Sequence, residues 1–230
     1  MPEWKIDREE YFSRLDISVQ EFKNELRLPA IDALRNIVPL RDLTCVDSLI
    51  PISFDFLAHL IRRIKTLDGR SPFTKARITM ANIDPRMLKI GQQFVYREIY
   101  QSLIEEAAGI FQRFCVASNG LGDVGAYFAF GSNGENAYAM ACYLPPIVEC
   151  HAGNLVVMDG IHRNYISRQT GKTQNAVFVD TIAEPFPCGM RGWEDVCVIP
   201  LSKKPARTED RYFELEQGLF RDLKYLGIDG

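Results

Sequence analysis

The chain has 230 residues, of which 47% are hydrophobic and 25% charged, as in ordinary globular proteins. Its 27 basic and 30 acidic side chains give a formal charge of −3, which offers no general attraction for nucleic acid and leaves only a local basic patch open. The N-terminus lacks the apolar core of a signal peptide, and no apolar run is long enough to span a bilayer. We therefore expect a cytoplasmic protein with no membrane partner.

Cysteine and histidine usage indicates neither a disulfide framework nor a metal centre. The six cysteines include no C-x-x-C pair, and the three histidines lie far apart in the sequence. This spacing is typical of reduced thiols, and a zinc site would need an unusual set of ligands. Cys150 and His151 are neighbours, but consecutive residues of a strand point to opposite faces, so we do not expect them to form a catalytic pair.

Residues 1–70 are predicted to form a helical N-terminal region. Ser18 and Glu21 have the spacing of a capping box, in which each side chain bonds the backbone N–H of the other residue at a helix start. A further helix fits residues 53–67, where four apolar residues recur on one face, namely Phe54, Leu57, Ile61 and Ile64. The turn-rich stretch 68–74 then indicates a subdomain boundary.

Residues 71–200 are predicted to form an α+β core, a small mixed sheet with flanking helices. Helices fit residues 90–114 and 161–170, and Gly171 suits the C-terminal end of the second. The predicted strands are 75–83, 114–118, 126–130, 137–144, 145–150, 155–160, 175–182 and 195–201. A turn rich in Gly and Asn joins the third and fourth of them as a hairpin. In the final segment, 201–230, helical spacing over residues 208–227 predicts a helix that packs on the core.

Two glycine-containing motifs resemble nucleotide-binding loops but lack the required setting. Gly120, Gly122 and Gly125 match G-x-G-x-x-G, yet a strand is predicted after them where a dinucleotide site needs a helix. The stretch TGKT, residues 170–173, resembles the end of a P-loop, but Ile166 stands where that motif requires glycine. We therefore interpret the first as a turn and the second as the exit from a helix.

The segment DGIHR, residues 159–163, is the candidate site because a strand is predicted before it and a helix after it. Asp159 occupies the expected N-cap position, and Gly160 has no side chain to block a ligand. The backbone N–H groups of a first helical turn attract anions, and here that turn would include Ile161, His162 and Arg163. Arg163 could clasp phosphate, and His162 could donate a hydrogen bond or move a proton. The residues alone are equally compatible with a local Asp159–Arg163 ion pair beside a surface histidine.

The order of elements in residues 145–180, together with D-G-I-H-R, resembles the core of the ParB/sulfiredoxin superfamily. That superfamily includes ParB partition proteins, sulfiredoxins, free-serine kinases and DndB-like proteins, and it uses the D-G-x-H-R turn to hold nucleotide phosphates. The stretch ITMANIDP, residues 78–85, resembles the start of the same domain more weakly. The resemblance implies that ATP or another nucleotide, with Mg²⁺, binds at Asp159, Gly160, Ile161, His162 and Arg163.

Departures from the superfamily pattern narrow the expected function. Ile161 stands where sulfiredoxins carry their catalytic cysteine, so sulfinic-acid reduction is not expected. Too little chain follows Asp180 for the helix-turn-helix region of a partition protein. The leading hypothesis is a phosphotransferase or nucleotide hydrolase in which Asp159, His162 and Arg163 act on the phosphate. Asp159 is the first candidate for a carboxylate base, and Glu149 is a weaker one.

Two other functions remain open at the level of sequence. A ParB-like nuclease or other DNA-binding or DNA-processing protein of DndB-like type could grip a nucleic-acid backbone in the same pocket, and salt-dependent DNA binding would reveal it. A non-catalytic interaction module would bind no nucleotide at all. The sequence does not fix the oligomeric state, and a homo-oligomer is compatible with it.

Overall fold

The structure is a computed structural model that describes residues 5–26, 31–116 and 121–223. The chain divides into two compact units, each assembled from segments that are distant in sequence. Unit 1 comprises Met1–Ile64, Gly125–Leu144 and Leu223–Gly230, and unit 2 comprises Lys65–Val124 and Pro145–Asp222. Several sheets and several helices are present, so the expected mixed α and β class is confirmed.

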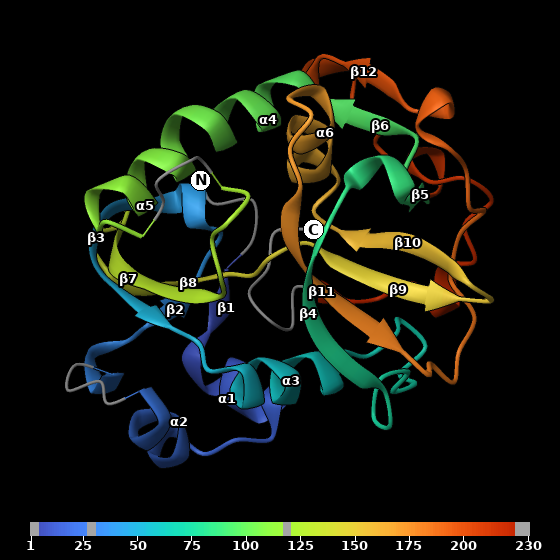
Figure 1. Ribbon diagram of the computed structural model, residues 1–230. Helices are drawn as coiled ribbons and strands as arrows, with labels where there is room; N and C mark the ends of the chain where they lie inside the picture. The colour runs from blue at the N-terminus through green and yellow to red at the C-terminus, as the bar shows by residue number, and fades with distance from the viewer. Residues whose placement is uncertain (1–4, 27–30, 117–120, 224–230) are drawn as a thin grey trace. The chain divides into compact units, whose positions relative to one another are not determined.

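Unit 1 combines helices with a five-stranded sheet. The helices are α1 (Arg8–Leu15), α2 (Val19–Leu26) and α3 (Phe54–Arg62), with short 3-10 turns η1 (Ile31–Ala33) and η2 (Leu40–Asp42). The sheet has the order β1-β2-β8-β7-β3, with bounds Ile6–Asp7, Asn36–Ile37, Tyr138–Tyr143, Tyr127–Asn133 and Leu43–Pro51 (Figure 1). The prediction that the first 70 residues are helical is therefore wrong for β1, β2 and β3.

Long-range pairing explains why β3 was missed. Its residues pair with β7, which lies far along the chain, and two register shifts interrupt the pairing. Because of these shifts, β3 lacks the strict apolar–polar alternation by which a strand is recognised in a sequence. The predicted capping box is confirmed: Ser18 Oγ accepts the Glu21 N–H at 3.1 Å, and Glu21 accepts the Ser18 N–H at 2.8 Å. The predicted hairpin is also confirmed, by β7 and β8.

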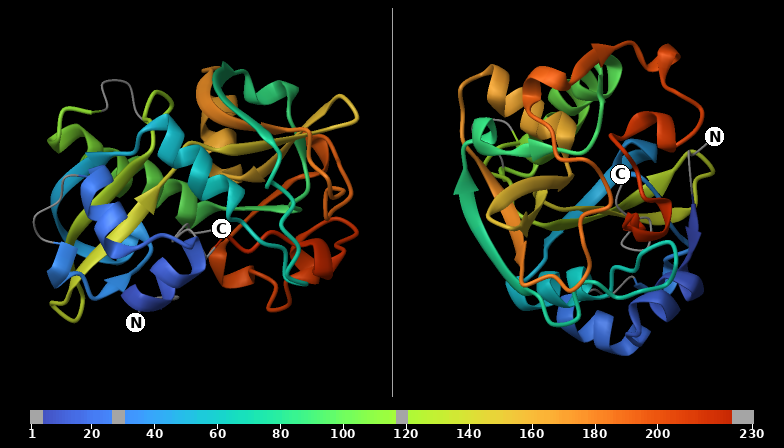
Figure 2. Two further views of the ribbon diagram at one scale, coloured as in Figure 1. Left: turned by 90° about the horizontal axis from the view of Figure 1, so that it is seen from below. Right: turned by 90° about the vertical axis from the view of Figure 1, so that its right-hand side faces the viewer.

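Unit 2 is organised around a second five-stranded sheet with the order β4-β11-β9-β10-β5. The bounds are Arg77–Ile83 for β4, Gln174–Asp180 for β11, Ile147–His151 for β9, Asn154–Asp159 for β10 and Lys89–Ile90 for β5. β9 and β10 form an antiparallel hairpin, and α6 (Ile161–Gln169) then leads into β11, which runs parallel to β9. Figures 1 and 2 show α6 beside this sheet. Ile161 at the start of α6 belongs to a core that includes Val148, Val157 and Ala176.

The long helix of unit 2 begins later than predicted. The helical stretch comprises α4 (Arg97–Ser102), a π-helical turn η4 (Leu103–Ala107) and α5 (Ala108–Arg113). The preceding residues form β6 (Phe94–Tyr96), which pairs in parallel with β12 (Cys197–Ile199), and this pairing withdraws them from the helix. The expected strand 114–118 is absent over 114–116, where Cys115 has a left-handed backbone, and its last two residues lie outside the described ranges.

The C-terminal helix predicted over residues 208–227 is wrong as far as the structure describes that segment. Only 3-10 turns occur there, η7 (Glu209–Arg211) and η8 (Gln217–Leu219). The backbone groups bond other segments instead: Phe213 N–H donates to Gly91, Leu67 N–H donates to Phe220, and Asp222 N–H donates to Lys65. These long-range bonds replace the intrahelical ones, so tertiary pairing has overridden a local helical pattern.

Other short 3-10 turns complete unit 2. They are η3 (Pro85–Met87), η5 (Trp193–Asp195) and η6 (Leu201–Lys203). Trp193 is buried, and its indole N–H donates to the Pro85 carbonyl at 2.8 Å. This bond ties η5 to η3, the turn that leads into β5 beside the candidate site strand β10.

Candidate functional site

The end of β10 contains a β-bulge that sets the direction of Asp159. Val157 lies opposite Val148, but Asp159 lies opposite Ile147, so one residue is left over between the two pairs. Directly opposed residues share a sheet face. The bulge therefore turns Asp159 away from the face that packs on α6 and toward the face that carries Ile147 and Glu149. Bulges often change the direction of a side chain in this way.

Gly160 forms the turn between β10 and α6 with a left-handed backbone, φ +87°. It takes the N-cap position predicted for Asp159, so that prediction is wrong, and no side-chain bond caps the helix there. A Cβ at Gly160 would lie 2.9 Å from Pro146 Cβ and 3.0 Å from Arg163 Nη2. The space left by the missing side chain is thus filled by Pro146 and Arg163, where we had expected room for a ligand.

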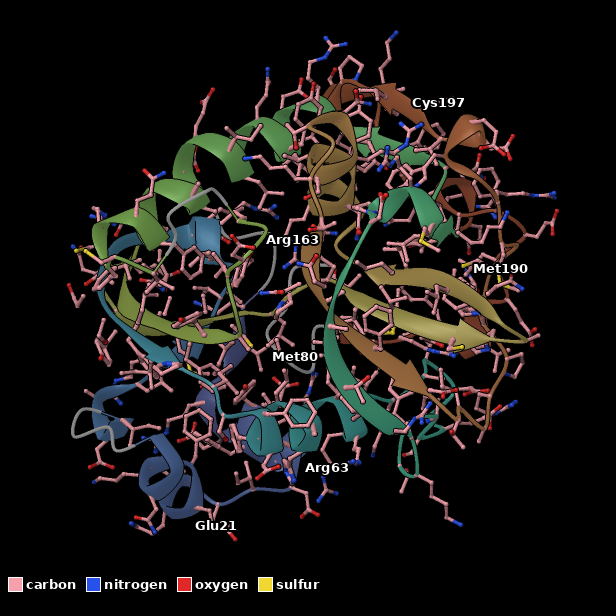
Figure 3. The ribbon with its side chains drawn as sticks, viewed as in Figure 1. Glu21, Arg63, Met80, Arg163, Met190 and Cys197 are labelled. Carbon is pink, nitrogen blue, oxygen red and sulfur yellow. The ribbon has the colours of Figure 1, made fainter. Side chains whose placement is uncertain are left out.

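Asp159 and Arg163 form a buried ion pair across the first turn of α6. Arg163 Nη2 donates to Asp159 Oδ2 at 2.8 Å, with side chains 11% and 4% exposed (Figure 3 labels Arg163). Burial raises the pKa of Asp159 above its ordinary value, and the Arg163 charge and the Gly160 N–H oppose that rise. The local ion pair that the residues left open is therefore present, and it places a guanidinium at a helix N-terminus.

His162 is anchored to β6 and is not a simple surface residue. Its Nε2 accepts the Tyr96 backbone N–H at 3.0 Å, and the two rings stack with centroids 5.7 Å apart. A ring nitrogen that accepts an N–H carries no proton, so the ring proton lies on Nδ1 in this arrangement. His162 is therefore oriented as an N–H donor through Nδ1, and Nε2 cannot take a proton without losing the bond to Tyr96.

A buried polar network fixes the helix behind the turn. Asn164 donates from both its backbone N–H and Nδ2 to the Gly160 carbonyl, at 2.9 and 3.0 Å. Gln174 Nε2 donates to Asn164 Oδ1, and Ser167 Oγ donates to Gln174 Oε1 at 3.0 Å. All three side chains are buried. Each bond satisfies a polar group that would otherwise be costly to bury, so the network positions α6 and the Gly160 turn.

Glu149, the weaker candidate for a carboxylate base, does not face solvent. It is fully buried and accepts two bonds from Arg221, Nε to Oε1 at 3.0 Å and Nη2 to Oε2 at 2.8 Å. His151 Nε2 also lies 2.6 Å from Glu149 Oε2. Burial raises the pKa of the nearby Cys188 thiol to about 12, so this cysteine stays protonated at neutral pH. Both candidate carboxylates are therefore paired with a guanidinium, but Glu149 has His151 as a second side-chain partner, which leaves Asp159 as the better candidate for the base.

Tyr212 joins the site from the C-terminal segment. It forms an antiparallel bridge with Gln92, whose Nε2 donates to the Tyr212 hydroxyl at 2.9 Å. Burial raises the pKa of Tyr212, the bond from Gln92 opposes that rise, and the neighbouring Cys188 and Asp159 groups add to it. The sequence pattern assigned Tyr212 to the predicted helix 208–227 and Gln92 to the predicted helix 90–114, and it gave no sign of the bond between them. No local signal could have found either residue, because a long-range bridge brings them together.

The Gly160 turn gives a matched test of packing. We expect Gly160→Ala to lower the free energy of unfolding by about 1–3 kcal/mol more than Gly153→Ala, because it adds overpacking to the same backbone strain. Gly153 has a similar φ of +81°, but a Cβ there would meet nothing within 4 Å. Urea denaturation of both variants measures the difference, and equal losses would show that Pro146 and Arg163 yield without cost.

The two rejected motifs lie where their predicted settings place them. Gly120 lies outside the described residues, but Gly122 lies in a turn, and strand β7 follows, as predicted. Gly171 follows α6 with a φ of +65°, which confirms the helix exit. Neither segment therefore opens a helix onto a ligand.

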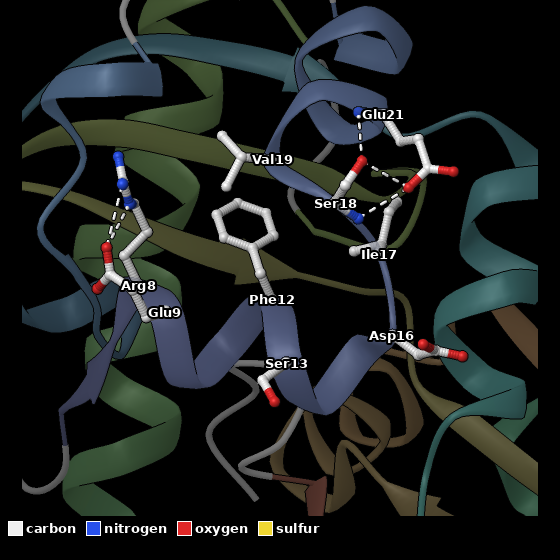
Figure 4. Close-up of a pocket in the computed structure, with 9 residues that line it drawn as sticks. All are labelled: Arg8, Glu9, Phe12, Ser13, Asp16, Ile17, Ser18, Val19 and Glu21. Atoms are coloured by element: carbon white, nitrogen blue, oxygen red, sulfur yellow. Dashed lines mark hydrogen bonds and ion pairs between the residues drawn. The ribbon is translucent and has the colours of Figure 1, made fainter.

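Unit 1 contains an open hollow of about 710 Å³ along α1 and α2 (Figure 4). Its polar lining includes Ser18 and Glu21, which bond each other, and Arg8, which pairs with Glu9. None of the residues that were predicted to bind phosphate lines it. The candidate site is therefore the β10–α6 turn of unit 2.

Within residues 5–26, 31–116 and 121–223, no group of three or more His, Cys, Asp or Glu side chains could hold a metal ion. Mg²⁺ bound with nucleotides usually takes one or two carboxylates. Asp159 is bonded to Arg163, so it does not fit the role of a Mg²⁺ ligand in this arrangement.

No helix in the same ranges has the length and hydropathy needed to cross a bilayer.

Comparison of the chain with family models, with curated proteins and with solved structures gave no significant match. The candidate function therefore rests on the residues and geometry of the β10–α6 turn.

Proposed function

We propose that the chain binds the phosphates of a nucleotide at the start of α6 and hydrolyses the terminal phosphoryl group. The observation that supports this is the meeting of Arg163 and Asp159 at the first turn of a nine-residue helix, both nearly buried. A helix N-terminus favours an anion, and a guanidinium beside it adds charge and paired donors. The resemblance of residues 145–180 to the ParB/sulfiredoxin superfamily supports the same placement.

The proposed roles follow from how each side chain is held. Arg163 donates to Asp159 through Nη2, and its planar guanidinium bridges that carboxylate and the bound phosphate. His162 acts as an N–H donor, because Tyr96 occupies its Nε2. Asp159 accepts the proton, and its raised pKa makes it a stronger base than an exposed aspartate.

The hydrolytic step uses only water as co-reactant. The water oxygen forms a bond to the terminal phosphorus, and the bond from that phosphorus to the bridging oxygen breaks. The Asp159 carboxylate takes the water proton, and the electron pair of the broken bond leaves with the shortened nucleotide. Charge that develops on the phosphoryl oxygens is stabilised by Arg163 and the first turn of α6.

Nucleotide affinity tests the proposed site independently of hydrolysis. We expect Arg163→Lys to lower the affinity for ATP, CTP or GTP at least about tenfold, because an ammonium cannot make the paired bonds of a guanidinium. Lysine keeps a positive charge near Asp159, whereas Arg163→Ala would also leave a buried carboxylate unpaired. The matched control is Arg168→Lys at the other end of α6, where the guanidinium lies over Trp193. Calorimetry with and without Mg²⁺ measures each affinity.

The Asp159→Asn variant distinguishes nucleotide binding from hydrolysis. Removing the negative charge beside Arg163 should preserve or strengthen nucleotide binding, while hydrolysis falls by about 10²–10⁴-fold. The wild-type rate should fall as the pH drops through the raised pKa of Asp159, since the base must be unprotonated. Equal affinities for the wild type and Arg163→Lys would contradict the site, and hydrolysis that survives in Asp159→Asn would contradict the base.

A further inference from the structure

Tyr96 is a buried tyrosine whose hydroxyl has no hydrogen-bond partner among the described residues. The residue is 5% exposed, so water reaches little of it. A buried hydroxyl without a partner costs free energy, and such groups are rare in folded proteins. The orphaned hydroxyl therefore indicates a group that the protein itself does not supply.

Tyr96 lies beside the first turn of α6, where the phosphate site is proposed. Its backbone N–H bonds His162 in the first turn of α6, and its ring stacks on the His162 ring. The same tyrosine belongs to β6, which pairs with β12. Strand pairing fixes the backbone of Tyr96, and the stacking on His162 holds its ring next to a side chain of that turn.

The surroundings of Tyr96 are cationic. The Lys204 ammonium lies 5.6 Å from the centre of the ring. Arg211 is close enough for its charge to act on the hydroxyl, and it is fixed by bonds of 2.8 Å to the carbonyls of Pro205 and Ala206. Such an environment favours an anionic acceptor over a neutral or cationic group.

The chemical character of the hydroxyl agrees with that choice. Burial raises the pKa of Tyr96, and the Arg211 charge opposes the rise only in part. The hydroxyl therefore keeps its proton at neutral pH and is available as a donor. An acceptor that carries negative charge would accept from the O–H group in surroundings that carry positive charge.

We propose that the Tyr96 hydroxyl donates to a second phosphate of the ligand whose first phosphate binds at the start of α6. This inference rests on the proposed function, and it names the ligand class as nucleoside di- or triphosphates in preference to monophosphates. Inorganic pyrophosphate has the same two linked phosphates and no base, so it is the simplest probe.

The test compares pyrophosphate with inorganic phosphate on Tyr96→Phe. We expect the variant to lose about 10- to 100-fold in pyrophosphate affinity, the range for a hydrogen bond to a charged group, and to bind inorganic phosphate as the wild type does. Its thermal stability should equal or exceed that of the wild type, because the substitution removes an unpaired buried hydroxyl. Tyr100→Phe is the control, since the Tyr100 ring packs on Tyr165 in the same unit and should leave both affinities unchanged.

The outcomes separate this inference from the proposed function. Unchanged pyrophosphate affinity in Tyr96→Phe, with normal binding by the wild type, would overturn the second-phosphate site and leave the proposed function standing. An equal loss for phosphate and pyrophosphate would also overturn it, because the hydroxyl would then act on the first phosphate. Failure of the wild type to bind either anion would instead overturn the proposed function on which the inference rests.

Discussion

Replacing Gly131 by alanine is expected to lower the free energy of unfolding by about 4–5 kcal/mol, among the largest effects of a single substitution. Gly131 lies in β7 opposite Val46 of β3, between the two register shifts of that pairing. A Cβ there would lie 1.8 Å from the Cys45 carbonyl oxygen and 2.8 Å from its carbon. Those atoms belong to the backbone, so relief of the clash requires β3 to separate from β7.

The control for this prediction is Gly134→Ala in the turn after β7. A Cβ at Gly134 meets nothing within 4 Å, so we expect a change within about 0.5–1 kcal/mol. Guanidinium unfolding followed by far-UV circular dichroism measures both variants. A Gly131→Ala protein with the stability of Gly134→Ala would show that the close approach of β3 to β7 does not hold in solution.

The parts of the fold that sequence reasoning predicted correctly are those set by neighbouring residues. The Ser18–Glu21 capping box and the Gly171 helix exit each depend on a few consecutive side chains. The order of β9, β10, α6 and β11 was also predicted, because each element has a clear period and a turn residue between it and the next. Local chemistry was sufficient at these positions.

The errors occur where distant segments compete for the same backbone groups. Residues 208–223 have helical spacing, but bonds such as the one between Phe213 and Gly91 take their N–H groups away from a helix. Residues 94–96 were read as helix for a similar reason, since their partner strand is about a hundred residues further along the chain. A pattern within one segment contains no information about such a partner.

At the candidate site, too, features set by neighbouring residues were predicted and features set by distant residues were missed. The sequence predicted that Asp159, Gly160, His162 and Arg163 meet in one turn, and it left the Asp159–Arg163 ion pair open. It could not predict the bulge that re-aims Asp159, because a bulge depends on the register with β9. Nor could it predict that Tyr96 holds His162, since these two residues are 66 positions apart.

The ion pair between Glu149 and Arg221 gives the second large prediction. Glu149 lies in β9 on the sheet face opposite α6, and the two side chains are 0% and 2% exposed. Arg221 also donates to the carbonyls of Leu219 and Pro185, so it fastens the C-terminal segment to the sheet. Removing one member of a buried pair leaves an uncompensated charge, whereas removing both charges is often nearly neutral.

We therefore expect Arg221→Met to lower the free energy of unfolding by about 3–5 kcal/mol at neutral pH. The double variant Glu149→Gln/Arg221→Met should recover much of that loss, because the glutamine is uncharged and can still bond His151. Urea titrations of both variants at neutral pH measure this difference. If the double variant is as unstable as Arg221→Met, then Arg221 acts mainly through its carbonyl bonds and its position over Phe73, and the charge of Glu149 is not the cause.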